Sequence, residues 1–165
     1  WKAVLAQYDA LRKKLYLEPS IVICGGEPLT SPLLVPFLDE IYSLCNSPKA
    51  FVLTNGTRIN RTIALKLKKH NITVQVSLDG AHAALHDSVR GKGNFEKAML
   101  GIKQLQEHDV KTVIQTVLSR NTATQIEDFF IVAKSLKVHS MNFTRLMPTG
   151  NGEALVSRGD DDVLS

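Results

Sequence analysis

Short apolar runs alternate with amphipathic segments along most of the chain, and this alternation constrains the fold more than any other feature. Apolar residues recur at helical spacing between runs that are typical of buried strands. The expected strands are Ile21–Cys24, Ala50–Thr54, Ile72–Leu78, Val110–Leu118 and Ser140–Leu146. Strands separated by helices pair in parallel through right-handed crossovers. The sequence therefore predicts an α/β fold with outer helices, either an open doubly wound sheet or an arc of a (β/α) barrel.

Capping residues predict where three of the intervening helices begin. Ser31 precedes Pro32, and proline is favoured in the first turn of a helix. Asn60 is expected to cap the next helix through its side chain. Thr124 and Glu127 have the spacing of a capping box, which predicts the start of the last helix.

Glycine and small polar side chains follow every expected strand. The five strand ends are residues 24–28, 54–57, 77–80, 119–121 and 145–150. Such residues also end strands because they form turns, and this accounts for any one of them. In a parallel fold, however, all five ends lie at one edge of the sheet, where ligands bind. We therefore expect the ligand site at this edge.

The strand end Gly25-Gly26-Glu27-Pro28 is the most informative of the five. Two glycines allow a ligand to approach the backbone N–H and C=O groups. The carboxylate of Glu27 suits an ammonium group, whereas a phosphate loop would favour a lysine and helix N–H donors. The pattern indicates a ligand with a cationic group, and a tight turn with an exposed glutamate is the alternative.

A longer connection after the third expected strand contains His86, Asp87 and Arg90. Arg90 can bind a carboxylate through two nitrogens, or it can pair with Asp87 on the surface. His86 can equally be a structural side chain that orders the loop. The other histidines lack metal-ligand spacing, and no Ser–His–Asp or Cys–His arrangement is recognisable.

Composition excludes several classes of partner. The formal charge is +4, and lysines and arginines are spread along the expected helices with few aromatic residues among them. We expect solvated helix faces and no nucleic-acid surface. No apolar run approaches the ~20 residues needed to span a bilayer, so no membrane association is expected. Two cysteines, Cys24 and Cys45, form no disulfide framework, which favours a cytoplasmic, reducing setting.

Four segments, in this order, resemble motifs of radical S-adenosylmethionine (SAM) enzymes. Gly25–Pro28 resembles their GGEP motif, and Leu53–Thr57 resembles their TNGT segment. Residues 76–95 resemble the pattern SLDG…HD..R…G.F, and residues 145–150 resemble an R..P.G loop. This version is typical of the SPASM-type branch, with anaerobic sulfatase-maturating enzymes, quinone-cofactor peptide modifiers and some heme-synthesis enzymes.

The resemblance implies a partial (β/α)₆ TIM-like barrel, in which the five strands are the second to the sixth and SAM lies across their ends. Gly25 and Gly26 would hold the methionine ammonium group, with Glu27 beside them. Ser77 would reach the ribose or the methionine carboxylate, and Arg90 would bind that carboxylate. The resemblance places four further cofactor-binding residues in the same site: Thr54, Asn55, Asp79 and Met147.

The resemblance also implies a [4Fe–4S] cluster held by cysteines spaced C-x₃-C-x₂-C, and this chain does not contain that motif. Cys24 and Cys45 are 21 positions apart, and cluster ligation needs thiolates at fixed positions. We expect residues 1–165 to be the central and C-terminal part of a radical SAM core. The first strand, the cluster loop and any C-terminal auxiliary domain would lie outside it.

The reaction implied for the full-length protein is reductive cleavage of SAM to a 5′-deoxyadenosyl radical. The implied substrate is a peptide, a protein side chain or a tetrapyrrole, and the implied reductant is a flavodoxin or ferredoxin. Two other functions stay open. One is a degenerate barrel that lost its cluster and serves as a binding or scaffold module. The other is a different (β/α) barrel enzyme that binds a phosphorylated metabolite.

Overall fold

The computed structural model describes residues 1–45 and 48–145 of the chain. These residues form an alternating series of helices and strands. Their order is α1 (Lys2–Lys14), β1 (Ser20–Ile23), the short 3₁₀ helix η1 (Pro28–Thr30), α2 (Leu34–Leu44), β2 (Lys49–Thr54), α3 (Arg61–Lys69), β3 (Thr73–Ser77), α4 (Ala83–Arg90), α5 (Asn94–Glu107), β4 (Thr112–Leu118), α6 (Arg120–Ala123), α7 (Ile126–Ser135) and β5 (Ser140–Arg145).

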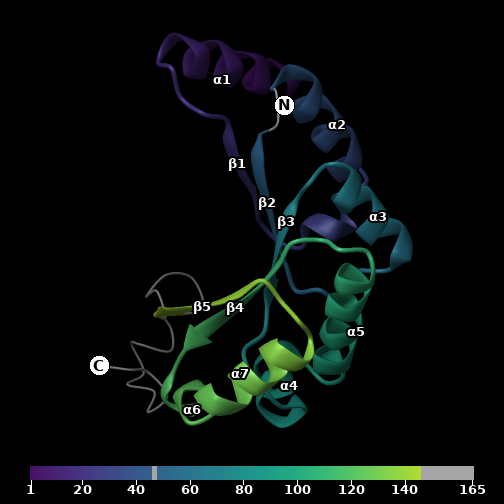
Figure 1. Ribbon diagram of the computed structural model, residues 1–165, viewed down its shortest axis with the longest axis vertical. Coiled ribbons are helices and arrows are strands. Elements are labelled where there is room, and N and C mark those ends of the chain that lie inside the picture. Colours follow the sequence, from purple (N-terminus) through teal and green to yellow (C-terminus); the bar gives the residue numbers. More distant parts are fainter. Residues whose placement is uncertain (46–47, 146–165) are drawn as a thin grey trace.

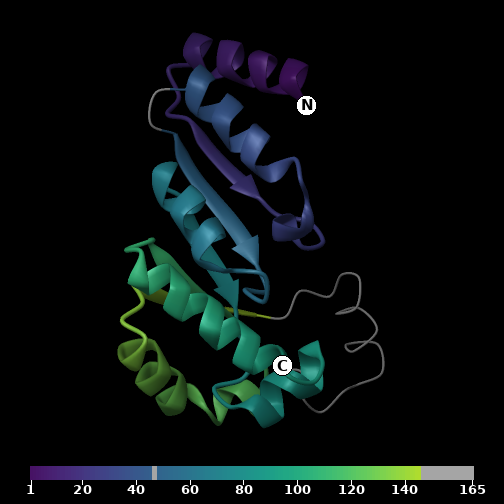
Figure 2. The same cartoon turned by 90° about the vertical axis from the view of Figure 1, so that its right-hand side faces the viewer.

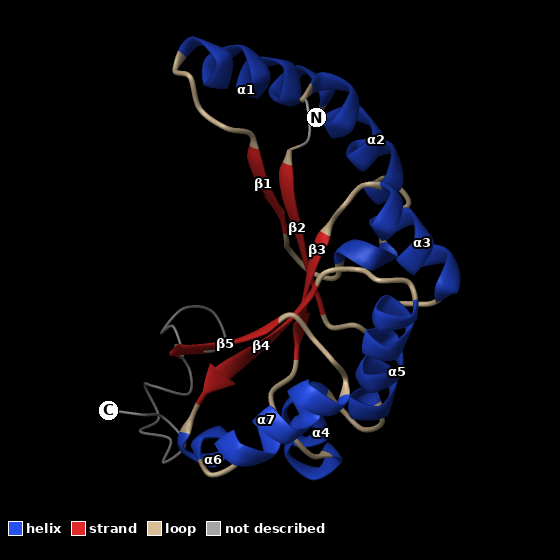
Figure 3. Cartoon of the chain, viewed as in Figure 1, coloured by secondary structure: helices blue, strands red, loops and turns tan. Residues whose placement is uncertain are grey.

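All five strands pair in parallel, and their order across the sheet is their order along the chain. Figure 1 shows the strands fanning from β1 to β5 as an arc, and Figure 3 shows helices α2, α3, α5 and α7 on its outer side. In Figure 2 this helical layer lies in front of the strands. The predicted α/β fold, with parallel strands and outer helices curved as a barrel arc, is confirmed.

The hydrophobic core lies between the sheet and the outer helices. Val52 of β2, Val74 of β3 and Val76 of β3 are fully buried on the helix side of the sheet. Leu67 of α3 and Ile102 of α5 complete the same cluster from the helices. β-branched residues suit these central strands because they pack well on a pleated surface. The core thus fixes the strands whose ends carry the candidate site.

A close backbone approach ties α5 to the loop that follows β2. A Cβ atom built on Gly101 of α5 would lie 2.3 Å from the carbonyl oxygen of Gly56, so no larger residue fits there without a shift. Gly56 itself has a φ of +77°, which favours glycine. The two glycines therefore allow the loop after β2 to pack directly against helix α5.

Two of the three predicted helix starts differ from the structure. Asn60 caps α3 as expected, because its Oδ1 accepts a hydrogen bond from the backbone N–H of Ile63 at 3.0 Å. The start predicted at Ser31 is wrong, since α2 begins at Leu34. Pro36, rather than the earlier proline, occupies the first turn, where a missing N–H costs least.

The capping box predicted at the last helix lies one short helix earlier. Ser119 and Thr122 form it at the start of α6, through reciprocal bonds between side chains and backbone N–H groups. The side chain of Gln125, which precedes α7, instead accepts a hydrogen bond from the backbone N–H of Ala81. Helix α4 was not predicted, because the segment reads as a connection and its short length carries little periodicity.

Candidate functional site

The carboxylate of Glu27 joins the loops that follow β1 and β2. It accepts hydrogen bonds from Thr54 Oγ1 at 2.6 Å and from the backbone N–H of Asn55 at 2.8 Å. Within its own loop it accepts a third from the backbone N–H of Leu29 at 3.1 Å. A carboxylate has about four lone-pair directions, so about one is left for a ligand. Glu27 is therefore both a link between two loops and an available acceptor.

Gly25 and Gly26 differ in the reason why glycine stands there. Gly25 has a φ of +134°, a conformation that other residues rarely adopt. Gly26 has no such φ, and a Cβ atom built on it would meet no atom of the described residues within 4 Å. Neither backbone conformation nor packing requires glycine at Gly26. Open space beside an unrestricted glycine is the arrangement expected where a ligand approaches the backbone closely.

The loop after β2 is fixed by its own side chains. Thr54 is buried, and its Oγ1 accepts a hydrogen bond from the backbone N–H of Gly56 at 3.1 Å. Asn55 Oδ1 accepts hydrogen bonds from the backbone N–H and the hydroxyl of Thr57, at 2.9 and 2.8 Å. With its oxygen occupied in this way, the Asn55 side chain has its amide N–H donors left for a ligand.

Ser77 ends β3 and is half-buried. Its hydroxyl makes no hydrogen bond to any other residue of the described part of the chain. Two positions later, Asp79 is buried, and its carboxylate oxygens accept hydrogen bonds from Arg90 Nε at 2.5 Å and the backbone N–H of Val117 at 3.3 Å. Ser77 is thus free to meet a ligand, whereas Asp79 is occupied by the protein.

Arg90 pairs with Asp79, and the alternative of a surface pair with Asp87 is not what the structure shows. Asp87 instead accepts hydrogen bonds from the backbone N–H groups of Gly93 at 2.6 Å and Phe95 at 2.8 Å, at the start of α5. These N–H groups, Phe95 first, hold the pKa of Asp87 below its ordinary value. A carboxylate at a helix N-terminus satisfies donors that the helix itself leaves unpaired.

His86 of α4 is fully buried. Its Nδ1 accepts a hydrogen bond from the backbone N–H of Asp79 at 3.1 Å, which places the proton of the neutral ring on Nε2. Burial lowers the pKa of His86, so the neutral ring is favoured. Within residues 1–45 and 48–145, Nε2 has no hydrogen-bond partner. The sequence singled out His86 but gave no signal that it binds the amide of Asp79.

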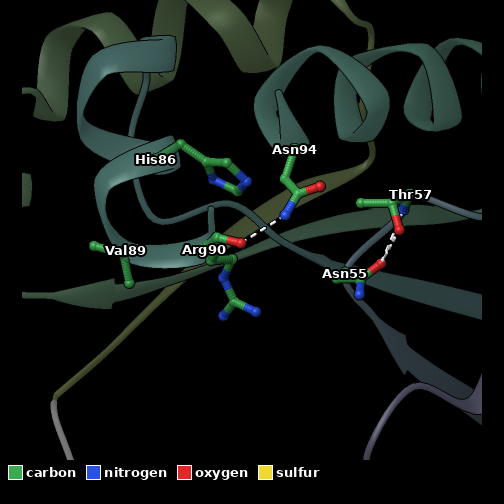
Figure 4. Close-up of a pocket in the computed structure, with 6 residues that line it drawn as sticks. All are labelled: Asn55, Thr57, His86, Val89, Arg90 and Asn94. Atoms are coloured by element: carbon green, nitrogen blue, oxygen red, sulfur yellow. Dashed lines mark hydrogen bonds between the residues drawn. The ribbon is translucent and has the colours of Figure 1, made fainter. Parts of the chain in front are cut away.

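A polar cavity of about 250 Å³ lies between the loop after β2, α4 and the start of α5. Figure 4 shows its lining residues, with Asn55 and Thr57 on one side and the two helices on the other. The lining residues are Asn55, Thr57, His86, Val89, Arg90 and Asn94. The structure therefore brings together Asn55 and Arg90, two of the predicted ligand residues, and connects them through Asn55 to Glu27.

Met147, predicted to lie near the adenine, falls outside the described residues, as does the rest of the loop that follows β5. Cys24 is exposed and Cys45 is buried. The described ranges contain no group of three His, Cys, Asp or Glu side chains that could hold a metal ion. The residues present fit a small polar ligand at the strand ends, and they do not fit an iron–sulfur cluster.

The strands are parallel, keep the order of the chain and curve as an arc inside a layer of helices (Figure 1), and the polar site lies at their C-terminal ends. These features together are typical of (β/α) barrel proteins. The chain belongs to the radical SAM superfamily, whose sequence profile matches residues 1–131.

Similar proteins agree with the SPASM-type branch. The AdoMet-dependent heme synthase of Methanosarcina barkeri is 34% identical over 138 residues, covering 82% of this chain and 39% of that protein. The mycofactocin maturase MftC of Mycobacterium ulcerans is 35% identical over 134 residues, covering 79% of this chain and 35% of that protein. The chain therefore spans less than two fifths of these relatives.

Solved structures share the fold. The anSMEcpe structure with bound AdoMet has a TM-score of 0.67 at 22% identity, covering 79% of this chain and 38% of that one. SuiB of Streptococcus suis bound to S-adenosylmethionine has a TM-score of 0.69 at 20% identity, covering 79% of this chain and 30% of that one. Within the described residues, no helix is both long and apolar enough to cross a membrane.

Proposed function

We propose that the chain is the central and C-terminal part of the core of a radical SAM enzyme. The first strand, the cluster loop and any auxiliary domain would lie elsewhere in the full-length protein. Two observations support this. The chain has two cysteines, 21 positions apart, and the relatives it matches are more than twice as long.

The proposed SAM site lies at the ends of β1, β2 and β3. The backbones of Gly25 and Gly26, with the remaining acceptor of Glu27, bind the methionine ammonium group. The hydroxyl of Ser77 meets the ribose or the methionine carboxylate, and Arg90 binds that carboxylate. When bound, SAM would supply a 5′-deoxyadenosyl radical for hydrogen abstraction, with one electron coming from a reduced cluster outside this chain and methionine as the leaving group.

Other residues of the proposed site act mainly by holding it. Thr54 fixes Glu27, and Asn55 offers its amide N–H groups to the ligand from the opposite wall of the cavity. Asp79 holds Arg90. We also propose that Met147 contacts the adenine of SAM.

One observation carries the proposal within the superfamily. Gly26 has neither a conformational nor a packing reason to be glycine, and the space beside it is open. Close contact between a ligand and the backbone of Gly26 would explain why glycine stands at this position. An ammonium group beside Glu27 and a carboxylate beside Arg90 match the two charges at the methionine end of SAM.

The proposed substrate is a peptide, a protein side chain or a tetrapyrrole, with a flavodoxin or ferredoxin as the reductant. The names of the relatives support this range. They include a heme synthase, a peptide-bound anSMEcpe and SuiB bound to its precursor peptide SuiA.

The test uses the full-length protein, reconstituted anaerobically with iron and sulfide and reduced with dithionite in the presence of SAM. We expect 5′-deoxyadenosine and methionine by mass spectrometry. The 165-residue chain, treated in the same way, should hold far fewer than the four irons of a cluster. A full-length protein that lacks C-x₃-C-x₂-C, or that carries a cluster and binds SAM without cleaving it, would overturn the proposal and favour a binding module.

A further inference from the structure

Asp79 is held in place by hydrogen bonds to two neighbouring elements. Its backbone N–H donates to His86 Nδ1 at 3.1 Å, and its Oδ1 accepts from the backbone N–H of Val117 in β4 at 3.3 Å. Only 6% of the residue is exposed. The carboxylate therefore has little freedom to move, and it belongs to the frame that joins β3, β4 and α4.

The second carboxylate oxygen of Asp79 anchors one edge of the Arg90 guanidinium. Oδ2 accepts from Arg90 Nε at 2.5 Å. The terminal nitrogens Nη1 and Nη2 make no hydrogen bond to any residue of the described ranges, and the side chain is 33% exposed. Figure 4 shows the guanidinium extending away from α4. One edge of the planar group is fixed, and the opposite edge is open.

We propose that Asp79 is a positioning residue that presents the Nη1/Nη2 edge of Arg90 to a ligand carboxylate, and does not contact the ligand itself. This inference rests on the proposed SAM site. A free arginine side chain samples many rotamers, and fixing it on binding opposes affinity. Anchoring Nε to a buried carboxylate removes much of that freedom before the ligand arrives. The planar fork then meets the carboxylate through two parallel hydrogen bonds.

Lysine cannot replace arginine in this arrangement. Its single ammonium group lies near either Asp79 or the ligand carboxylate, and it has no second edge that could meet the other. Arg90→Lys keeps the charge, but we expect it to weaken SAM binding nearly as much as Arg90→Ala. This variant tests the orientation even if a change at Asp79 prevents folding.

The experiment is a double-mutant cycle on the reconstituted full-length protein, with titration of SAM and of decarboxylated SAM. The variants are Arg90→Ala, Asp79→Asn and the double variant, with Asp109→Asn as the control. Asp109 pairs with Lys68 on the surface. We expect Arg90→Ala to weaken SAM binding by about tenfold or more and Asp79→Asn by roughly threefold to tenfold. The double variant should bind no more weakly than Arg90→Ala.

Decarboxylated SAM separates positioning from a general structural effect. Neither Arg90→Ala nor Asp79→Asn should change the affinity for decarboxylated SAM, because this ligand lacks the carboxylate that Arg90 binds. If Arg90→Ala leaves SAM binding unchanged, the proposed site is wrong. If Arg90→Ala weakens SAM binding but Asp79→Asn and Arg90→Lys do not, the site stands and the positioning role of Asp79 is overturned. Equal losses for both ligands in Asp79→Asn also contradict positioning.

Discussion

Replacing Glu27 by glutamine keeps the size of the side chain but removes one acceptor oxygen. In the structure the two oxygens accept three hydrogen bonds, from the backbone N–H groups of Leu29 and Asn55 and from the hydroxyl of Thr54. An amide NH₂ group placed toward Asn55 would face a donor with a donor. Hydrogen bonds to a charged group contribute roughly 1.5–3 kcal/mol each, and partial exposure reduces this. We expect Glu27→Gln to lower the free energy of unfolding by about 1–2 kcal/mol.

The assay is thermal and urea denaturation of the purified chain, followed by circular dichroism. In a protein of this size, 1 kcal/mol shifts the melting temperature by roughly 2–4 °C, so a decrease of about 2–8 °C is expected. Glu18→Gln is the matched control, because Glu18 is exposed and precedes β1. If Glu27→Gln has the same melting temperature and urea midpoint as Glu18→Gln, the carboxylate of Glu27 does not join the two loops.

Three further changes probe the frame around the site. Gly101→Ala should destabilise the protein strongly, by roughly 2 kcal/mol, because the new Cβ would meet the carbonyl oxygen of Gly56 at 2.3 Å; urea unfolding at an unchanged midpoint would contradict this. Asp87→Ala removes two bonds to backbone N–H groups at the start of α5, and melting should occur roughly 3 °C lower. Because the pKa of His86 is lowered in the folded state, its contribution to stability is complete above about pH 6.5 and is lost as the pH falls below that value. His86→Asn keeps an acceptor but does not titrate there, so its stability should depend less on pH between about 7.5 and 5.5; an unchanged slope would refute the assignment.

The strands and the edge at which glycine and polar side chains gather could be predicted from the sequence because both depend on local patterns. The run from Phe51 to Thr54 followed by Asn55-Gly56 marks a strand and its end without any knowledge of its neighbours. Parallel pairing then places all such ends at one edge of the sheet. These inferences need periodicity and turn chemistry, which are properties of neighbouring residues.

The partners within the site could not be predicted, because they join residues that are distant in the sequence. Glu27 and Thr54 meet only once β1 and β2 pair, and Asp79 meets Val117 only beside β4. The alternative pairing of Arg90 with Asp87 does not form, for a related reason. Asp87 is close in sequence, but the N-terminus of α5 offers it two backbone donors, and Asp79 is left to pair with Arg90.

The most direct test of the SAM site is a single methyl group at Gly26. Its φ lies outside the left-handed region, and its Cβ would meet no atom of the described residues within 4 Å, so Gly26→Ala should fold with an unchanged melting temperature. The methyl group should nevertheless block the close approach of the methionine end of SAM. Calorimetric titration into the reconstituted full-length protein should then give an affinity lower by about tenfold or more. Equal affinities for SAM in the two proteins would contradict a SAM site at this strand end.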